Sequence, residues 1–184
     1  PQSLTRNQGA SATFNVTVAG SWPLSYQWYL NGSAISGATQ SSYTDANVQP
    51  GDAGSYTVVA TNDFGSASSD AAVLTVIVAP TITTQPASQT VTQGNSVTFT
   101  AAATGTAPLS FQWQKGGAPI SGATGTSYSL SNVQSASAGT YTVVVSNGAG
   151  SVTSGNAVLT VYVPPAITTQ PVGQTVARGA SATF

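Results

Sequence analysis

The residues of this chain that could do covalent chemistry are almost all hydroxyls. It contains 25 Ser and 27 Thr, but only 3 Lys+Arg and 4 Asp+Glu, and it has no His, Cys or Met. A hydroxyl becomes a nucleophile only when a general base lies beside it. The chain has no His, and its one lysine, Lys115, lies in a Lys-Gly-Gly turn, where we do not expect it to activate a hydroxyl. The usual enzyme chemistries therefore have no residues to carry them, and we expect no catalytic residue and no cofactor.

The four carboxylates are all aspartates, and their spacing does not suit a metal ion. Asp45, Asp52, Asp63 and Asp70 are spread over 26 residues. Calcium takes about six to eight oxygens, usually from one short loop, so we predict no metal site. Asp52 is expected to cap a turn. Asp45 has two interpretations: either the end of its strand opens and the carboxylate meets solvent, or it marks a contact or cation site.

Low charge limits the partners of the chain. Charged residues make up 4% of it, and the formal net charge is -1 at pH 7. Three scattered cations cannot neutralise a phosphate backbone, so we expect no nucleic-acid partner. The longest apolar runs, such as residues 71–79, are too short for a membrane span. A surface of hydroxyls and amides has little mutual repulsion, which permits association with other proteins.

The elements that position these residues are repeated with a period of 85 residues. Residues 25–28, 53–59 and 72–76 recur almost unchanged as 110–113, 138–144 and 157–161, with no insertion or deletion. A third copy begins at residues 167–171, which repeat residues 82–86 as Ile-Thr-Thr-Gln-Pro. A gapless long-period repeat is typical of tandem domains.

Within each copy, apolar and polar residues alternate with period two, as in Tyr141, Val143 and Val145. Turn signals such as Asn31-Gly32 and Asn147-Gly148 separate the runs. About seven short strands per copy predict an all-β fold of β-sandwiches. We assign residues 1–78 to a domain lacking its first strand and residues 79–163 to a complete domain. Residues 164–184 are then the first strands of a third repeat, truncated or donated.

Each copy resembles an immunoglobulin-like domain of the I-set type. Trp28 and Trp113 stand where strand C of that fold carries a buried tryptophan, and Tyr56 and Tyr141 stand in its tyrosine-corner motif. The resemblance implies tandem immunoglobulin-like β-sandwiches in an end-to-end rod. The positions of the usual inter-sheet disulfide hold no cysteine, so there are no disulfides and apolar packing must replace them. The expected core residues are Trp28, Tyr56, Val16, Val58, Trp113, Tyr141, Ala101 and Val143.

Three aromatic residues of the first copy align with non-aromatic residues in the second, and they are Trp22, Tyr29 and Phe64. In the immunoglobulin-like fold, the loops that hold Trp22 and Phe64 share the end that faces a preceding domain, so we predict an exposed apolar cap there. That cap is an interface with a neighbouring immunoglobulin-like domain, a platform for a glycan or small ligand, or ordinary local packing. The candidate interface residues are Trp22, Phe64, Tyr29 and Asp45.

The junctions between copies contain proline and no glycine or serine hinge, which predicts semi-rigid spacers. The chain is expected to be a piece of a longer array, or a subunit that lends its terminal strand to the next chain. The candidate linking or donated strand is Ile167, Thr168, Thr169 and Gln170.

These features predict a non-catalytic structural repeat of an extracellular stalk, adhesin shaft or self-assembling filament, joined through contacts between immunoglobulin-like domains. The alternative is a recognition module that binds glycan or protein through the exposed aromatics. Expected partners are further immunoglobulin-like repeats of the same or neighbouring chains, and glycans or other surface proteins. Cysteine-free repeats of this kind are similar to those of secreted or surface proteins of bacteria, which implies an extracellular or cell-surface location.

Overall fold

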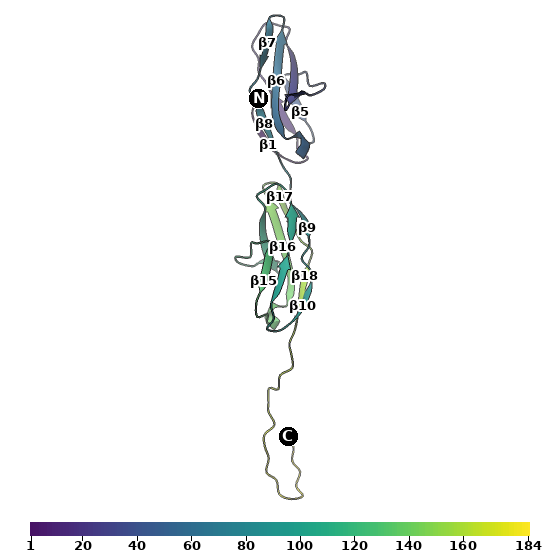
Figure 1. Cartoon of the computed structure of the whole chain (residues 1–184), viewed down its shortest axis with the longest axis vertical. Helices are drawn as coiled ribbons and strands as arrows, with labels where there is room; N and C mark the ends of the chain where they lie inside the picture. Colours follow the sequence, from purple (N-terminus) through teal and green to yellow (C-terminus); the bar gives the residue numbers. More distant parts are fainter.

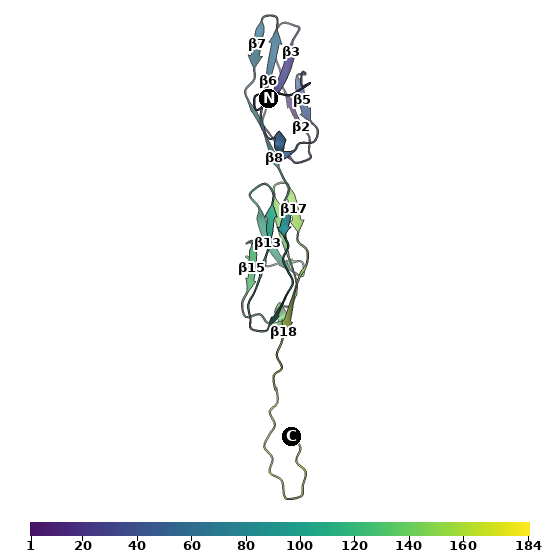
Figure 2. The same ribbon diagram turned by 45° about the vertical axis from the view of Figure 1, so that its right-hand side comes forward.

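The computed structural model describes residues 1–184 and shows two β-sandwiches followed by an extended tail. The sandwiches lie end to end along the long axis, and the tail continues beyond the second one (Figures 1 and 2). We call residues 1–78 the first domain, residues 79–163 the second domain and residues 164–184 the C-terminal tail, which contains no strand. The predicted all-β architecture of tandem sandwiches is confirmed.

The first domain has two facing sheets. The larger has the strand order β1-β8-β6-β3-β4 with β7 paired to β6, and the smaller consists of β2 and β5. Its elements are β1 (Leu4–Asn7), β2 (Ala12–Asn15), β3 (Ser25–Leu30), β4 (Ser33–Ala34), β5 (Ser42–Asp45), η1 (Pro50–Asp52), β6 (Gly54–Asn62), β7 (Gly65–Ser68) and β8 (Ala72–Ile77).

The second domain repeats this arrangement and adds one strand pair. Its larger sheet has the order β10-β18-β16-β13-β14 with β17 paired to β16, and the remaining pairs are β11-β15 and β9-β12. Its elements are β9 (Thr81–Thr84), β10 (Gln89–Thr92), β11 (Val97–Thr100), β12 (Ala102–Thr104), β13 (Ser110–Lys115), β14 (Ala118–Pro119), β15 (Ser127–Leu130), η2 (Ser135–Ser137), β16 (Gly139–Asn147), β17 (Gly150–Thr153) and β18 (Ala157–Tyr162).

The extra pair marks the main difference between the domains. In the second domain β9 and β12 form an antiparallel edge, whereas residues 16–19, which match residues 101–104, form no strand. The β1 and β8 strands pair in parallel over four residues, and β10 and β18 do the same. Every other aligned strand has a counterpart 85 residues away.

A buried tryptophan lies at the centre of each sandwich. Trp28 and Trp113 are 0% exposed, and each donates its indole N–H to a backbone carbonyl, of Gln40 and Gly125 respectively, at 2.9 Å. This bond satisfies the one polar atom of the indole, so the whole ring can be buried without leaving an unpaired donor.

Aliphatic side chains fill the positions that would carry a disulfide, and the chain contains no cysteine. Val58, Val143 and Ala101 are buried. Val16 is only half-buried and packs against the edge of the first core. The first core is therefore less completely enclosed than the second at this edge.

The two tyrosine corners form as expected. The hydroxyl of Tyr56 donates to the carbonyl of Asp52 at 2.8 Å, and that of Tyr141 donates to the carbonyl of Ser137 at 2.7 Å. The predicted turn cap is also confirmed, because Oδ2 of Asp52 accepts the backbone N–H of Gln49 at 2.7 Å. Both tyrosines are buried and pack beside the central tryptophan cluster.

High pH should destabilise the first domain through Tyr56. Burial raises the pKa of Tyr56 from 10.0 to about 12, and the neighbouring Tyr43, Asp52 and Asp45 add to the shift. Between those two values the unfolded chain has lost the phenol proton while the folded chain keeps it, so stability is intact below about pH 10 and falls as the pH rises towards 12. We expect the melting temperature of the first domain, followed by circular dichroism, to fall over this range.

The matched variant Tyr56→Phe has no phenol proton to lose. Its melting temperature should start lower, because the bond to Asp52 is gone, and should then change less between about pH 10 and 12. Equal slopes for the variant and the unmodified chain would contradict the assignment.

Candidate interaction surfaces

The junction between the domains is closed by hydrogen bonds around Val78. Its N–H donates to Oγ1 of Thr106 at 2.8 Å, and its carbonyl accepts the N–H of Thr106 at 3.0 Å. The side-chain amide of Asn147 donates to the carbonyls of both Val78 and Thr106, at 2.7 and 2.9 Å. We call Val78, Thr106 and Asn147 the junction clamp.

Close packing supports the clamp. Strand β8 ends at Ile77 and β9 begins at Thr81, so three residues connect the domains. The Cδ1 atom of Ile77 lies 3.6 Å from the position that a Cβ on Gly148 would occupy, and a Cβ on Gly105 would lie 3.0 Å from Cα of Pro80. Because the loops of the second domain touch the backbone of the connection, the domains have little room to bend.

The matching end of the first domain carries the predicted aromatic cap. Asn62, the counterpart of Asn147, donates its amide to the carbonyl of Ser21 at 2.9 Å, which ties the two loops together. Trp22 follows Ser21 and Phe64 follows shortly after Asn62, and they are 82% and 86% exposed. The structure therefore brings Trp22 and Phe64 to one end of the domain, with both rings open to solvent.

Tyr29 and Asp45 do not join that cap. Tyr29 is half-buried near the end of β3 where its neighbour Leu30 pairs with Tyr56, away from the loops of Trp22 and Phe64. The expectation that the strand opens at Asp45 is wrong, because β5 runs to Asp45, which pairs with Ala12.

Strand β5 stays paired at Asp45 because the side chain of Asp45 has a hydrogen-bond partner close by. Its Oδ1 accepts the N–H of Asn47 at 3.0 Å, so the carboxylate is satisfied by a local turn and the strand can stay paired.

The carboxylates of the chain do not gather into a group that could hold a metal ion. Neither 3-10 helix has the length or apolar character required to span a bilayer.

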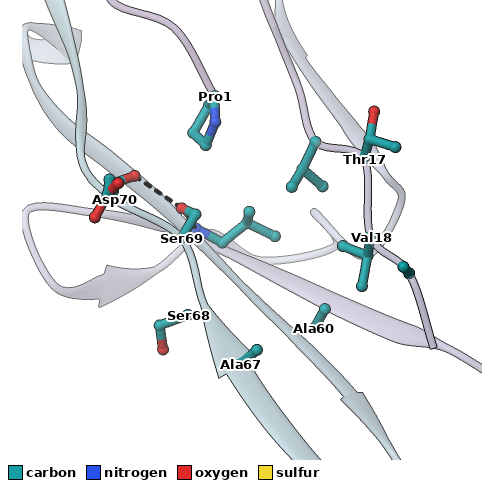
Figure 3. Close-up of a pocket in the computed structure, with 11 residues that line it drawn as sticks. Pro1, Thr17, Val18, Ala60, Ala67, Ser68, Ser69 and Asp70 are labelled. Carbon is teal, nitrogen blue, oxygen red and sulfur yellow. Dashed lines mark hydrogen bonds between the residues drawn. The ribbon is translucent and has the colours of Figure 1, made fainter.

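A groove on the first domain lies along the edge that β9 covers in the second. It has a volume of about 390 Å³, and a second hollow of about 250 Å³ continues it towards Asn62 and Phe64. Val18, Ala19, Ala60 and Ala67 line both. Figure 3 shows Thr17 and Val18 on one side and Ala60, Ala67 and Ser68 below, with Pro1 and Asp70 towards the other end. We call this surface the first-domain groove.

Sequence comparison of the two copies locates the groove but not its depth. The open edge follows from the missing strand pair, whereas the hollow depends on which side chains stay half-buried without that strand. Val18 and its counterpart Ala103 have similar exposure, so the exposure of this position does not by itself indicate the hollow beside Val18.

Two family models match the chain, one for each domain. Residues 1–76 match the Immunoglobulin I-set domain, and residues 79–147 match an Immunoglobulin domain. A three-domain structure from titin superposes with a TM-score of 0.79 at 25% identity, covering 93% of this chain and 66% of that one.

Curated relatives are much longer than this chain. Muscle M-line assembly protein unc-89 of Caenorhabditis elegans is 38% identical over 183 residues, covering 87% of this chain and 2% of that protein. Roundabout homolog 2 of Homo sapiens is 33% identical over 144 residues, covering 76% of this chain and 10% of that protein. The chain thus spans a tenth or less of the length of either relative. The family matches and the titin-like architecture agree with the two sandwiches described above, and the chain consists of immunoglobulin-like domains in tandem.

Proposed function

We propose that this chain is a non-catalytic structural repeat segment of an extracellular stalk, adhesin shaft or self-assembling filament. The observation that carries the proposal is the junction clamp, in which three hydrogen bonds join Val78 of the first domain to Thr106 and Asn147 of the second. Tandem domains that touch only their neighbours form extended rods, whose shape is set by each junction.

Composition and similarity add support. No residue set of the chain suits catalysis, and a charge content of 4% leaves little repulsion between neighbouring rods. The name of unc-89 describes an assembly protein, which agrees with a structural role for repeats of this kind. An extracellular location and a bacterial source are part of this proposal, and their support is the cysteine-free repeats. The two relatives named above are animal proteins and do not bear on a bacterial source.

Replacing Asn147 with alanine should loosen the rod without unfolding either domain. The change removes the two bonds to Val78 and Thr106, and bonds of this kind contribute about 1 kcal/mol each. We expect residual dipolar couplings of the unmodified chain to fit one alignment tensor for both domains. The variant should need two different tensors, because its domains reorient independently.

The matched control is Asn62→Ala, which removes a bond to Ser21 inside the first domain only. It should leave the common alignment unchanged. Two independent tensors in the unmodified chain would overturn the rod.

Recognition of a glycan or protein is the second candidate, favoured by the two exposed rings of Trp22 and Phe64. Aromatic faces of this size bind sugar rings and partner side chains. Tryptophan fluorescence that responds to a glycan in the unmodified chain, and not in Trp22→Ala, would favour recognition over assembly.

A further inference from the structure

The clamp residue Asn147 is followed by Gly148, and an Asn-Gly pair is a site at which an asparagine can lose its side-chain amide. The backbone nitrogen of the glycine attacks the side-chain carbonyl carbon of the asparagine, ammonia leaves, and a cyclic imide closes. Water then opens the imide to aspartate or isoaspartate. Glycine favours the attack because it has no Cβ to hinder a close approach of its backbone. The chain has two such pairs, Asn31-Gly32 and Asn147-Gly148.

The docked junction holds the amide of Asn147 on both of its polar atoms. The nitrogen donates to the carbonyls of Val78 and Thr106 at 2.7 and 2.9 Å, and Oδ1 accepts the N–H of Ala149 at 2.9 Å. The turn between β16 and β17 that carries these residues lies at the end of the second domain that faces the first (Figure 1). Because the amide nitrogen must leave as ammonia, its two bonds to the junction must break before the imide can form.

The neighbouring glycine is open to the reaction. Gly148 is exposed, so hydroxide can reach its N–H and water can reach the imide, whereas Asn147 is half-buried against the junction. The two requirements for the reaction, a free amide and a free backbone nitrogen, are therefore met together only when the domains separate at this point.

We propose that Asn147 is a deamidation site that the docked junction protects, and that its conversion to aspartate or isoaspartate releases the first domain from the second. The inference rests on the junction clamp of the proposed function and adds a chemical event that ends it. The net change is a hydrolysis, in which the side chain loses ammonia and gains water, so water is the only co-reactant.

The product cannot replace the amide in the clamp. A carboxylate only accepts hydrogen bonds, and the two groups that Asn147 holds are carbonyl oxygens, which also only accept. A negative charge would then face both oxygens at close range. Isoaspartate adds a methylene group to the backbone of the turn as well. Either product leaves Val78 bonded to Thr106 alone.

The first domain has the same asparagine without the labile neighbour. Asn62, the counterpart of Asn147, donates to the carbonyl of Ser21 at 2.9 Å, and its Oδ1 accepts the N–H of Phe64 at 3.0 Å. The next residue is Asp63, whose side chain hinders the attack and whose charge opposes loss of the backbone proton. The hydrogen bonding of this asparagine therefore does not require a glycine after it, and the lability belongs to the copy at the junction.

The rate of deamidation tests the protection. The full chain is aged at mildly alkaline pH, and each asparagine is followed by peptide mass spectrometry. In Gly105→Ala a new Cβ would lie 3.0 Å from Cα of Pro80 and displace the connection. We expect Asn147 to convert at least about fivefold faster in this variant, since that is the effect of one lost hydrogen bond. Gly20→Ala is the matched control with an unchanged rate, and exposed Asn31 should convert equally in every variant.

A second variant separates an opened junction from a weakened domain. Thr106→Val keeps the shape of the side chain and removes the Oγ1 atom that accepts the N–H of Val78 at 2.8 Å. It should also speed conversion of Asn147, by at least about twofold. Equal rates in Thr106→Val and the unmodified chain would overturn the protection, even if Gly105→Ala reacts faster.

The orientation of the domains tests the release. Residual dipolar couplings of Asn147→Asp should need two alignment tensors, and the unmodified chain should come to need two as Asn147 converts. Gly148→Ala is the matched control: its Cβ would lie 3.6 Å from Cδ1 of Ile77, an ordinary contact, so it keeps the clamp while hindering the attack. This variant should keep one tensor through the same ageing. One tensor in Asn147→Asp would overturn the release.

These outcomes are separable from failure of the rod itself. One tensor in the fresh chain that persists after Asn147 has converted leaves the rod standing and overturns only this inference. Two independent tensors in the fresh chain overturn the rod, whatever the rate of conversion at Asn147.

Discussion

Replacing Trp28 with alanine is expected to unfold the first domain while the second domain stays folded. Trp28 is 0% exposed and contacts the ring of Phe14 at a centroid distance of 6.2 Å. Removing a buried tryptophan costs about 3–5 kcal/mol. A domain of this size is stable by only about 4–12 kcal/mol, and no disulfide is present to limit the loss.

Differential scanning calorimetry with amide NMR spectra measures this effect domain by domain. We expect the transition of the first domain to disappear or move far down in temperature, and the signals of the second domain to persist. Trp22→Ala is the control, because Trp22 is 82% exposed and its loss should change stability by less than about 0.5 kcal/mol. A native transition of the first domain in Trp28→Ala would show that the tryptophan does not hold its core.

Gly105→Ala should disrupt the junction more strongly than loss of a hydrogen bond. Gly105 has a φ of +146°, and its new Cβ would lie 3.0 Å from Cα of Pro80 and 3.2 Å from the carbonyl oxygen of Ala79. Both contacts are with backbone, so the connection itself must shift. Strain of this kind costs about 1–3 kcal/mol, which should lower the melting temperature of the second domain by roughly 5–20 °C and release the inter-domain orientation.

Gly20→Ala provides the comparison at the equivalent position of the first domain. A Cβ there would meet only the side chains of Asn62 and Leu24, at 3.6 and 3.7 Å, which is ordinary contact. This variant should keep its melting temperature and its common alignment tensor. If Gly105→Ala behaves in the same way, the loop does not press on the connection as described.

The 85-residue repeat and the alternation of apolar and polar residues within it predict most of the fold, because burial of one strand face depends on local sequence. Tyr56 and Asp52 could be placed for the same reason, since each forms its hydrogen bond within its own turn. The clamp could not be predicted. Asn147 is part of a turn signal in the sequence, and its bond to Val78, 69 residues earlier, exists only once two domains are docked.

At Asp45 the sequence led to a wrong prediction, because a local hydrogen bond was left out of the reasoning. The second domain has Leu130 at the matching position, and Leu130 packs against the buried core. If burial alone is considered, an aspartate at this position indicates an opened strand. A hydrogen bond from the backbone two residues later instead removes the cost of leaving the carboxylate unpaired. The short-range hydrogen bond of the aspartate thus determines the structure at this position, and hydrophobic periodicity alone predicts it wrongly.

The parallel pairs β1-β8 and β10-β18 also determine how the rod would respond to tension. In the second domain the chain enters through β9 at one end, continues into β10, and leaves through β18 at the other end, with strands close to the long axis (Figure 1). Pulling on the two ends slides β10 and β18 past each other, so the hydrogen bonds of their four-residue register carry the load together. The force at which a domain yields is then set by this short patch and its unfolding rate, not by the total stability of the sandwich.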